Sequence, residues 1–213
     1  MSLEDLRREY SFGRLNRESL RDNPFEQFRH WLDQAITTEL IADPTAMCVA
    51  TVNADGRPWQ RMVLLKQVDD RGLVFYTNLG SRKAADIAVN PRVSLHFPWN
   101  AMDRQVIIGG TAVRLGTADV LRYFISRPRE SQLAAWASRQ SSRLNSRQAL
   151  ETQLLQMRDK FRDGEIPVPD FWGGFRVEPD EFEFWQGCAN RLHDRFRYRR
   201  EKGGGWQIER LAP

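Results

Sequence analysis

The C-terminal part of the chain carries the densest group of side chains suited to binding chemistry. Residues 186–195 read Q-G-C-A-N-R-L-H-D-R and lead into Phe196. The segment is typical of a β-strand, in which side chains two residues apart share a face, so Arg191, His193 and Arg195 are expected to point the same way. At about 7 Å spacing, three such donors could converge on one anionic ligand. An edge strand whose basic side chains are simply solvated fits this segment equally well.

Motifs elsewhere decide between these two interpretations. The run Phe184-Trp185-Gln186-Gly187, followed by Arg191-Leu192-His193-Asp194-Arg195, resembles the C-terminal signature of the pyridoxine/pyridoxamine 5′-phosphate oxidase family, which are FMN enzymes that make pyridoxal 5′-phosphate. Segments that match this family in the same order are 61–66, 75–78 with 81–83, 126–129 with Ser131, and 140–143. Residues 6–10 also resemble the family's substrate-covering arm. Because the likeness spans nearly the whole chain, it favours a binding face.

Composition limits the other possibilities. At 213 residues, the chain fits one well-buried domain. We expect an N-terminal arm at 1–22 and a single oxidase domain at 23–213. Hydrophobic residues make up 41% and charged residues 28%, which indicates a packed globule and argues against a membrane protein. Cys48 and Cys188 form neither a disulfide framework nor a metal-ligand spacing, so we expect a cytoplasmic protein without a metal.

The charge of the chain is moderately basic. Lys and Arg total 32 against 28 acidic residues, for a net charge of +4. The basic residues are dispersed in short groups with no long basic run, but charge alone cannot choose between nucleic acid and other anionic partners. With the resemblance, we expect neither nucleic acid nor a membrane as a partner. Arginine also recognises phosphate through paired donors, so the same excess suits a protein that holds a phosphorylated cofactor and substrate.

Periodicity along the chain predicts a mixed structure. Asn23-Pro24 with Glu26 marks the start of a helix. Period-two patterns predict strands at 47–52, 59–68, 73–77, 93–97, 105–115, 174–185, 193–200 and 206–211. Further helices are expected at 81–89, 117–126, 131–137 and 146–162.

Many antiparallel strands with inserted helices give an α+β class, and closure into a barrel would remove exposed strand edges. The resemblance implies more, namely a predominantly antiparallel FMN-binding split β-barrel that forms a homodimer.

The cofactor that the resemblance implies is FMN, whose terminal phosphate needs cationic donors. Arg61, Arg82 and Lys83 are the candidates, because Ser81-Arg82-Lys83 opens a helix whose N-terminal amides add positive potential. A solvated helix start is the alternative for Arg82 and Lys83. The cofactor positions implied by the matching motifs are Arg61, Met62, Val63, Leu64, Leu65, Lys66, Tyr76, Thr77, Arg82, Lys83, Gln105, Gln140, Ser141, Trp185 and Arg195.

Lys66 poses a geometric problem, because strict alternation places it on the strand face opposite Arg61. Either a bulge intervenes or Lys66 projects beyond the cofactor toward the substrate, and the resemblance favours the latter. It implies a substrate phosphate site of Lys66, Tyr123, Arg127 and Ser131, although a structural cluster at a helix end is an alternative. The remaining substrate residues implied are Arg7, Arg8, Glu9 and Tyr10 as a closing arm, with Arg191, Leu192 and His193.

The implied chemistry is transfer of a hydride from C4′ of pyridoxine 5′-phosphate or pyridoxamine 5′-phosphate to FMN, which yields pyridoxal 5′-phosphate. Oxygen then reoxidises the flavin and forms hydrogen peroxide. Arg191 and His193 are the catalytic candidates: Arg191 would clamp the substrate, and His193 would hydrogen-bond its exocyclic groups. Whether His193 moves a proton stays open. Cys188 departs from the expected pattern, and His30 and His96 are expected to be structural.

Three alternatives remain at the level of function. An FMN reductase or an oxidase of another substrate would keep Arg61, Arg82 and Lys83 without needing the substrate set. A non-catalytic carrier could bind flavin or pyridoxal phosphate and release it. A nucleic-acid-binding barrel would need stacking aromatics on a basic strand face, whereas the aromatics here lie mainly in apolar runs.

Overall fold

The computed structural model describes residues 2–5 and 8–213. The helices are α1 (Pro24–Thr37), α2 (Arg82–Val89), α3 (Thr117–Ser126), α4 (Arg129–Ala137) and α5 (Arg147–Lys160), with 3-10 turns at Leu3–Asp5, Arg17–Ser19, Asn100–Met102 and Ala189–Arg191. The strands are β1 (Ala46–Val52), β2 (Pro58–Leu64), β3 (Gln67–Asp69), β4 (Gly72–Asn78), β5 (Arg92–Trp99), β6 (Arg104–Arg114), β7 (Trp172–Gln186), β8 (Asp194–Arg200) and β9 (Trp206–Leu211). The predicted α+β class is confirmed.

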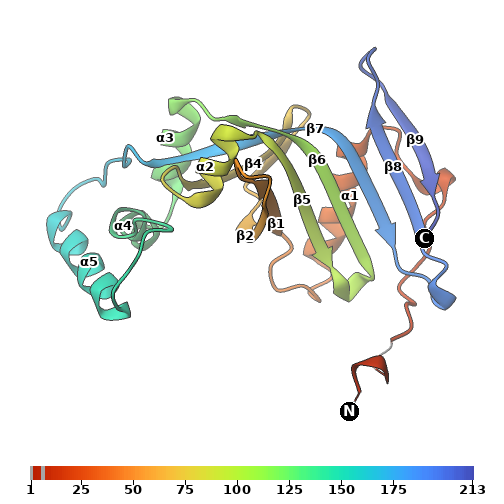
Figure 1. Cartoon of the computed structure of the whole chain (residues 1–213), viewed down its shortest axis with the longest axis horizontal. Helices are drawn as coiled ribbons and strands as arrows, with labels where there is room; N and C mark the ends of the chain where they lie inside the picture. The colour runs from red at the N-terminus through yellow and green to blue at the C-terminus, as the bar shows by residue number, and fades with distance from the viewer. Residues whose placement is uncertain (1, 6–7) are drawn as a thin grey trace.

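Nine strands of the described chain form one antiparallel sheet in the order β2-β1-β5-β6-β7-β4-β3, and β8 joins β7 and then β9. The long strand β7 pairs with β4 along its first half and with β8 along its last part. Figure 1 shows the consequence: α3, α4 and α5 lie at one end of the molecule, and β8 and β9 lie at the other.

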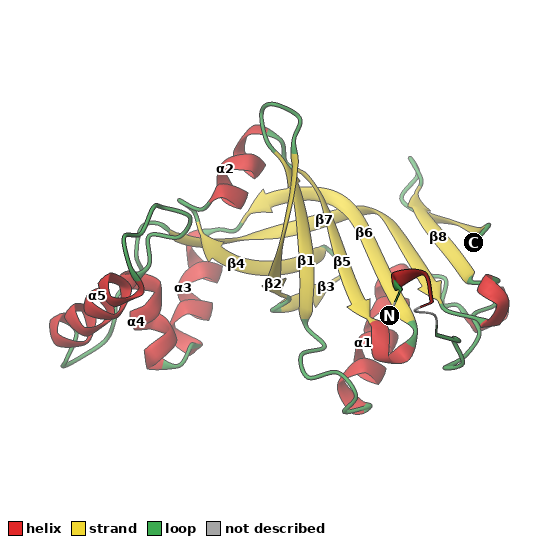
Figure 2. Cartoon of the chain, turned by 60° about the horizontal axis from the view of Figure 1, so that its bottom comes forward, coloured by secondary structure: helices red, strands yellow, loops and turns green. Residues whose placement is uncertain are grey.

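A bulge bends the sheet where β6 pairs with β7, and the register shifts between Gly109 and Gly110. A side chain at Gly110 would place its Cβ 2.4 Å from the carbonyl oxygen of Glu178, so only glycine fits. Such bends let a long sheet curl, as Figure 2 shows.

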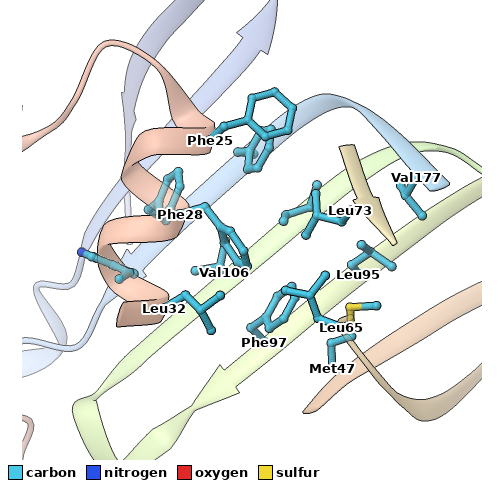
Figure 3. Packing of buried hydrophobic residues seen from close by; sticks show 14 of the residues in the cluster. Phe25, Phe28, Leu32, Met47, Leu65, Leu73, Leu95, Phe97, Val106 and Val177 are labelled. Carbon is cyan, nitrogen blue, oxygen red and sulfur yellow. The ribbon is translucent and has the colours of Figure 1, made fainter. Parts of the chain in front are cut away.

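The main core lies between α1 and the concave face of the sheet. Asn23 caps the helix by accepting a hydrogen bond from the backbone N–H of Phe25 at 2.9 Å, which confirms the predicted helix start. Phe28 is fully buried and its ring lies edge-on to Phe97, with ring centroids 4.9 Å apart. Figure 3 shows this packing, with Leu65 among the core side chains.

The structure corrects the single strand predicted at 59–68. The strand ends at Leu64 and pairing resumes at Gln67, because Leu65 turns into the core, where it is 4% exposed. The backbone N–H of Lys66 donates to the carbonyl of Val74 at 2.8 Å. The alternation that seemed to oppose Arg61 and Lys66 is therefore interrupted before Lys66.

The predicted strand face at the C-terminal signature is wrong. Arg191 ends a 3-10 turn with a φ of 60°, and Asn190 before it has a φ of 56°, so both have left-handed backbones. Strand β8 begins only at Asp194. Arg191 and His193 therefore lie in a loop and do not share a strand face with Arg195.

Candidate functional site

A cavity of about 520 Å³ opens between β2, β4 and the helices α3 and α4. Its lining includes many of the residues that the sequence predicted for cofactor and substrate. These are Met62, Val63, Leu64, Lys66, Tyr76, Thr77, Lys83, Tyr123, Arg127, Ser131 and Gln140. The fold thus brings together side chains that lie as far apart in the sequence as Met62 and Trp172.

Lys83 is the most informative cation in the cavity, because it is only 7% exposed. Its Nζ donates to Thr77 Oγ1 at 2.9 Å, Ser81 Oγ at 3.2 Å and Gln140 Oε1 at 2.9 Å, all neutral oxygens. Burial, and then the positive charge of Arg61, lower the pKa of Lys83 to about 8. An amine held in this way favours an anionic ligand, which would compensate its charge.

Arg61 lies next to this cavity but is held by protein groups. Its Nη1 donates to Thr51 Oγ1 at 2.7 Å and to the carbonyl of Val49 at 3.2 Å, and its Nη2 is 3.7 Å from Asp86 Oδ2. Thr51 in turn donates to Asp86 at 2.6 Å. These contacts fix the position of the Arg61 guanidinium beside the cavity. They involve Val49, Thr51 and Asp86, so they do not compensate the positive charge of Lys83.

Arg82 stacks on a residue that sequence reasoning missed. Its Cζ lies 3.5 Å from the ring centroid of Trp59, and Arg57 lies 4.9 Å from the same ring. The backbone N–H of Arg82 donates to Ser141 Oγ at 3.2 Å. The only signal for Trp59 in the sequence is its position two residues before Arg61 on one strand face.

Arg127 brings a second cationic group to the cavity. Its Nη1 is buried and has no hydrogen-bond partner among the described residues, and its Cζ lies 5.0 Å above the ring of Trp172. The rings of Tyr76, Tyr123 and Trp172 are nearly parallel to one another, and the centroid of Tyr76 lies 3.9 Å from that of Tyr123 and 5.3 Å from that of Trp172. Buried guanidinium donors are rarely left unpaired, so this nitrogen fits an anionic ligand. Trp172 also escaped sequence reasoning.

The other predicted site residues gather at the far end of β7. Gln105, Trp185 and Arg195 are direct cross-strand neighbours on β6, β7 and β8. Arg195 forms an ion pair with Glu183 at 2.8 Å and donates to the carbonyl of Ala212 at 2.7 Å. This row therefore lies on a sheet surface, away from the helices that line the cavity (Figure 1).

The aromatic ring of Tyr10, from the N-terminal segment, completes this second group. The ring of Tyr10 lies edge-on to Trp185 and to His193, with centroids 5.6 and 5.2 Å apart. Arg8 forms an ion pair with Asp103. Glu9 and Arg191 are exposed, as is Leu192, whereas Arg7 lies outside the described residues.

A single chain holds these two groups apart. Strand β7 has 15 residues, with Trp172 at the cavity and Trp185 near its opposite end. At about 3.3 Å per residue, the two backbone positions are separated by up to roughly 40 Å. The chain therefore carries two separate groups of candidate residues, here called the cavity half-site, around Lys83 and Arg127, and the loop half-site, around Trp185 and His193.

Comparisons with known proteins agree with this architecture. The fold is shared with a pyridoxamine 5′-phosphate oxidase-related, FMN binding protein from Nostoc punctiforme, at a TM-score of 0.71 and 15% identity over 91% of this chain and 100% of that one. Residues 33–161 match the family described as pyridoxamine 5′-phosphate oxidase. Residues 172–213 match the pyridoxine 5′-phosphate oxidase C-terminal dimerisation region. The chain belongs to the pyridoxamine 5′-phosphate oxidase family.

Relatives within this family are similar over almost their full length. A pyridoxine/pyridoxamine 5′-phosphate oxidase from Teredinibacter turnerae is 61% identical over 213 residues, which is 100% of both chains. One from Serratia proteamaculans is 61% identical over 209 residues, covering 98% of this chain and 95% of the relative. PhzG from Burkholderia lata, solved with tetrahydrophenazine-1-carboxylic acid, has a TM-score of 0.86 and 30% identity over 92% and 95% of the two chains.

The described residues contain neither a metal-binding cluster nor a membrane-spanning helix. No cluster of three or more His, Cys, Asp or Glu side chains there is arranged to hold a metal ion. None of the helices in this part of the chain combines the length and apolarity needed to span a membrane.

Proposed function

We propose that the protein is an FMN-dependent oxidase that converts pyridoxine 5′-phosphate or pyridoxamine 5′-phosphate to pyridoxal 5′-phosphate and reduces oxygen to hydrogen peroxide. The observation that carries the proposal is that one cavity is lined both by the buried Lys83 and by Arg127, whose Nη1 has no hydrogen-bond partner among the described residues. Two phosphorylated ligands would satisfy these two cations. The names of the relatives that are 61% identical support the same activity.

The residues present fit FMN as the cofactor. Lys83, with Arg61 and Arg82 nearby, would hold the terminal phosphate, since Lys83 has only neutral acceptors among the described residues. When bound, FMN supplies the hydride acceptor and passes the electrons to oxygen. The cavity-lining segment 62–64, with Tyr76, would flank the flavin.

The substrate phosphate is assigned to Lys66, Tyr123, Arg127 and Ser131, which line one wall of the same cavity. Tyr123 and Arg127 lie four residues apart at the C-terminal end of α3. The stacked rings of Tyr76, Tyr123 and Trp172 stiffen this wall, so the phosphate donors are preorganised.

The loop half-site would act on the reacting end of the substrate. Arg191 would clamp and orient the pyridine ring, and His193 would hydrogen-bond the oxygen or nitrogen on C4′ or the neighbouring 3-oxygen substituent. Arg8, Glu9 and Tyr10 would close over the substrate and exclude water. Gln105, Trp185 and Arg195 would contact the flavin from this side.

Both half-sites can serve one substrate only if two chains meet. We infer a homodimer in which the loop half-site of one chain faces the cavity half-site of its partner. The match of residues 172–213 to a dimerisation region supports this assembly. So do the exposed apolar side chains Met62, Leu64 and Ile107 on the outer sheet surface, which are 57%, 40% and 39% exposed.

The division into an arm at 1–22 and one oxidase domain at 23–213 and the cytoplasmic location stay predictions. Leu15 and Leu20 of the arm are buried against the core, so part of this segment packs with the domain.

An anaerobic titration tests the proposed function. The purified protein should show flavin absorption bands, and pyridoxine 5′-phosphate should bleach them. This reduction should form one pyridoxal 5′-phosphate per flavin before oxygen is present, and admission of oxygen should then restore the bands and form one hydrogen peroxide per flavin. A flavin that the substrate does not bleach would leave the carrier as the better interpretation.

A further inference from the structure

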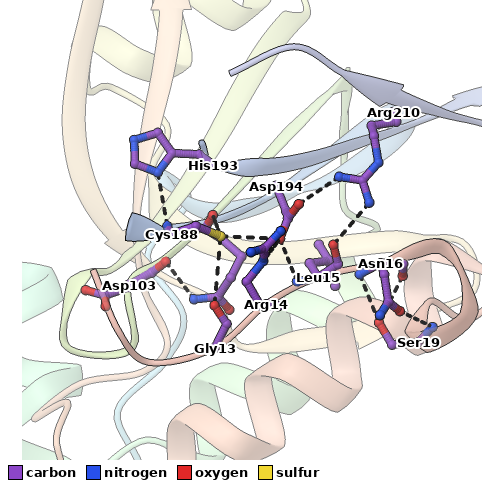
Figure 4. A network of polar contacts seen from close by, with 11 residues as sticks. Gly13, Arg14, Leu15, Asn16, Ser19, Asp103, Cys188, His193, Asp194 and Arg210 are labelled. Carbon is purple, nitrogen blue, oxygen red and sulfur yellow. Dashed lines mark hydrogen bonds and ion pairs between the residues drawn. The ribbon is translucent and has the colours of Figure 1, made fainter. Parts of the chain in front are cut away.

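The loop between β7 and β8, residues 187–193, is held by specific backbone contacts. Figure 4 shows that the backbone N–H of Cys188 donates to His193 Nδ1, at 3.1 Å. The N–H of Gly187 donates to the carbonyl of Asp103 at 2.7 Å. Between Cys188 and His193, the residues Asn190 and Arg191 have left-handed backbones. This strained conformation persists only where the surroundings impose it.

The contact from Cys188 determines the state of the His193 ring. A backbone N–H can only donate, so Nδ1 of His193 must present its lone pair. In the neutral ring the hydrogen is then on Nε2, which is free to donate outward. The rings of Tyr10 and Trp185, with centroids 5.2 and 4.7 Å from the imidazole, restrict its rotation.

The side chain of Cys188 is anchored on the opposite side of the loop. It is 2% exposed, and its Sγ lies 3.3 Å from Asp194 Oδ2. Asp194 is itself buried and also accepts from the Leu15 N–H at 3.0 Å, Arg14 Nε at 3.0 Å and Arg210 Nη1 at 2.7 Å. Cys188 is thus fixed at its backbone by His193 and at its thiol by Asp194.

Asp194 remains a carboxylate under ordinary conditions. Burial alone would raise its pKa, but the hydrogen bonds from Leu15, Arg210, Cys188 and Arg14 outweigh burial and lower the pKa to about 2. It can therefore hold the thiol and the arm together throughout the neutral range.

We propose that Cys188 and Asp194 are positioning residues that hold His193 as the Nε2–H tautomer, a hydrogen-bond donor toward the substrate, and that the arm completes this arrangement through Arg14 and Leu15. The inference rests on the proposed function, because it assigns His193 a donor role at the reacting end of the substrate. It also answers why a cysteine is tolerated beside the signature, since its buried thiol has a partner.

The tautomer can be measured without turnover. The FMN-loaded enzyme would be labelled with ¹⁵N-histidine, and the signal of His193 would be assigned by its loss in His193→Asn; His30 and His96 supply the remaining signals. We expect Nε2 to carry the hydrogen and Nδ1 to be bare. A hydrogen on Nδ1, or an equal mixture of the two tautomers, would overturn the proposal.

A matched pair of variants tests the anchor. Cys188→Ala removes the contact to Asp194, whereas Cys188→Ser keeps a donor at the same place. Cys188→Ala should mix the two tautomers and slow flavin reduction in a single anaerobic turnover about five- to tenfold, as expected for one lost hydrogen bond, with FMN content unchanged. Cys188→Ser should restore both the single Nε2–H tautomer and the wild-type rate of flavin reduction. Equal tautomer populations and rates in the alanine variant and the wild type would refute the positioning role.

The two proposals fail separately. If pyridoxine 5′-phosphate does not reduce the wild-type flavin, the proposed function is wrong, and the tautomer measurement in the alanine and serine variants still decides whether Cys188 positions the ring.

Discussion

Lys83 and Arg127 of the cavity half-site form no ion pair with the described residues, so an anionic ligand would balance their charges. Lys83 is the clearest case, because burial and Arg61 lower its pKa to about 8. Below that pH the free protein presents an ammonium group, which favours the FMN phosphate. Above it, binding must first add a proton to the amine, so affinity should fall by up to about tenfold per pH unit.

The measurement is the FMN dissociation constant of the apoprotein between pH 7 and 9.5, where the cofactor phosphate is already fully ionised. Lys83→Arg should flatten the curve, because an arginine stays charged over this range. Parallel curves for the two proteins would show that another group titrates.

Arg127 is assigned to the substrate phosphate. Arg127→Ala should therefore raise KM for pyridoxine 5′-phosphate by roughly ten- to a hundredfold, the value of one charge-assisted contact, while FMN content stays near normal. Arg122→Ala is the matched control, since Arg122 lies on the same helix and pairs at the surface with Asp119 at 3.2 Å. If Arg127→Ala loses flavin and keeps its KM, the two phosphate sites are interchanged.

The ring of Trp59 stacks on the guanidinium of Arg82, with 3.5 Å between the ring centroid and Cζ. Trp59→Leu should weaken FMN binding about three- to thirtyfold, because a partly desolvated cation–π contact contributes roughly 0.5 to 2 kcal/mol. Trp59→Phe keeps an aromatic face and should recover much of that loss. Titration of each apoprotein with FMN measures the effect, and equal affinities for the leucine and phenylalanine variants would exclude a stacking role.

At the level of elements, local sequence determined most of what could be predicted. The cap at Asn23 and the period-two strands depend on neighbours in the chain, so their positions agree with the structure. The errors arise where distant contacts decide the backbone. Leu65 leaves its strand to enter the core, and Arg191 adopts a left-handed φ in a loop closed by Cys188 and His193.

The same reason explains which site residues were missed. Trp59 and Trp172 contact Arg82 and Arg127 through the fold, and their roles leave no spacing pattern in the sequence. The motif-based positions that line the cavity could be predicted because the sequence resembles the family's motifs at those positions.

Two buried carboxylates, those of Asp103 and Asp194, hold the N-terminal arm, and the contacts of Asp103 can be tested by themselves. Asp103 accepts from the backbone N–H of Ser11 at 3.0 Å and of Phe12 at 3.2 Å, and it pairs with Arg8. Asp103→Asn weakens these contacts, so trypsin should cleave within residues 8–17 several-fold faster than in the wild type.

Asp22→Asn serves as the control for this experiment, because Asp22 pairs with Arg17 at the exposed end of the same arm. Timed digestion followed by mass spectrometry of the fragments measures both rates. Equal acceleration in the two variants would indicate that general loss of charge, and not the Asp103 contacts, loosens the arm.

At the level of the whole molecule, the length of β7 decides the architecture of the site. A strand of 15 residues keeps the cavity half-site and the loop half-site up to roughly 40 Å apart in one chain. The sequence predicts both sets of residues but contains no sign of which chain supplies each set. That information arises only once the sheet is formed, and it makes a shared site between two chains the central claim.

Mixed dimers test this claim most directly. One chain would carry Arg127→Ala and the other Arg191→Ala, with different affinity tags so that only mixed dimers are isolated. If each site combines the cavity of one chain with the loop of its partner, one site carries both changes and the other carries neither. The mixed dimer should then show about half of the wild-type rate of pyridoxal 5′-phosphate formation. A rate no higher than that of the two parent variants would contradict the shared site.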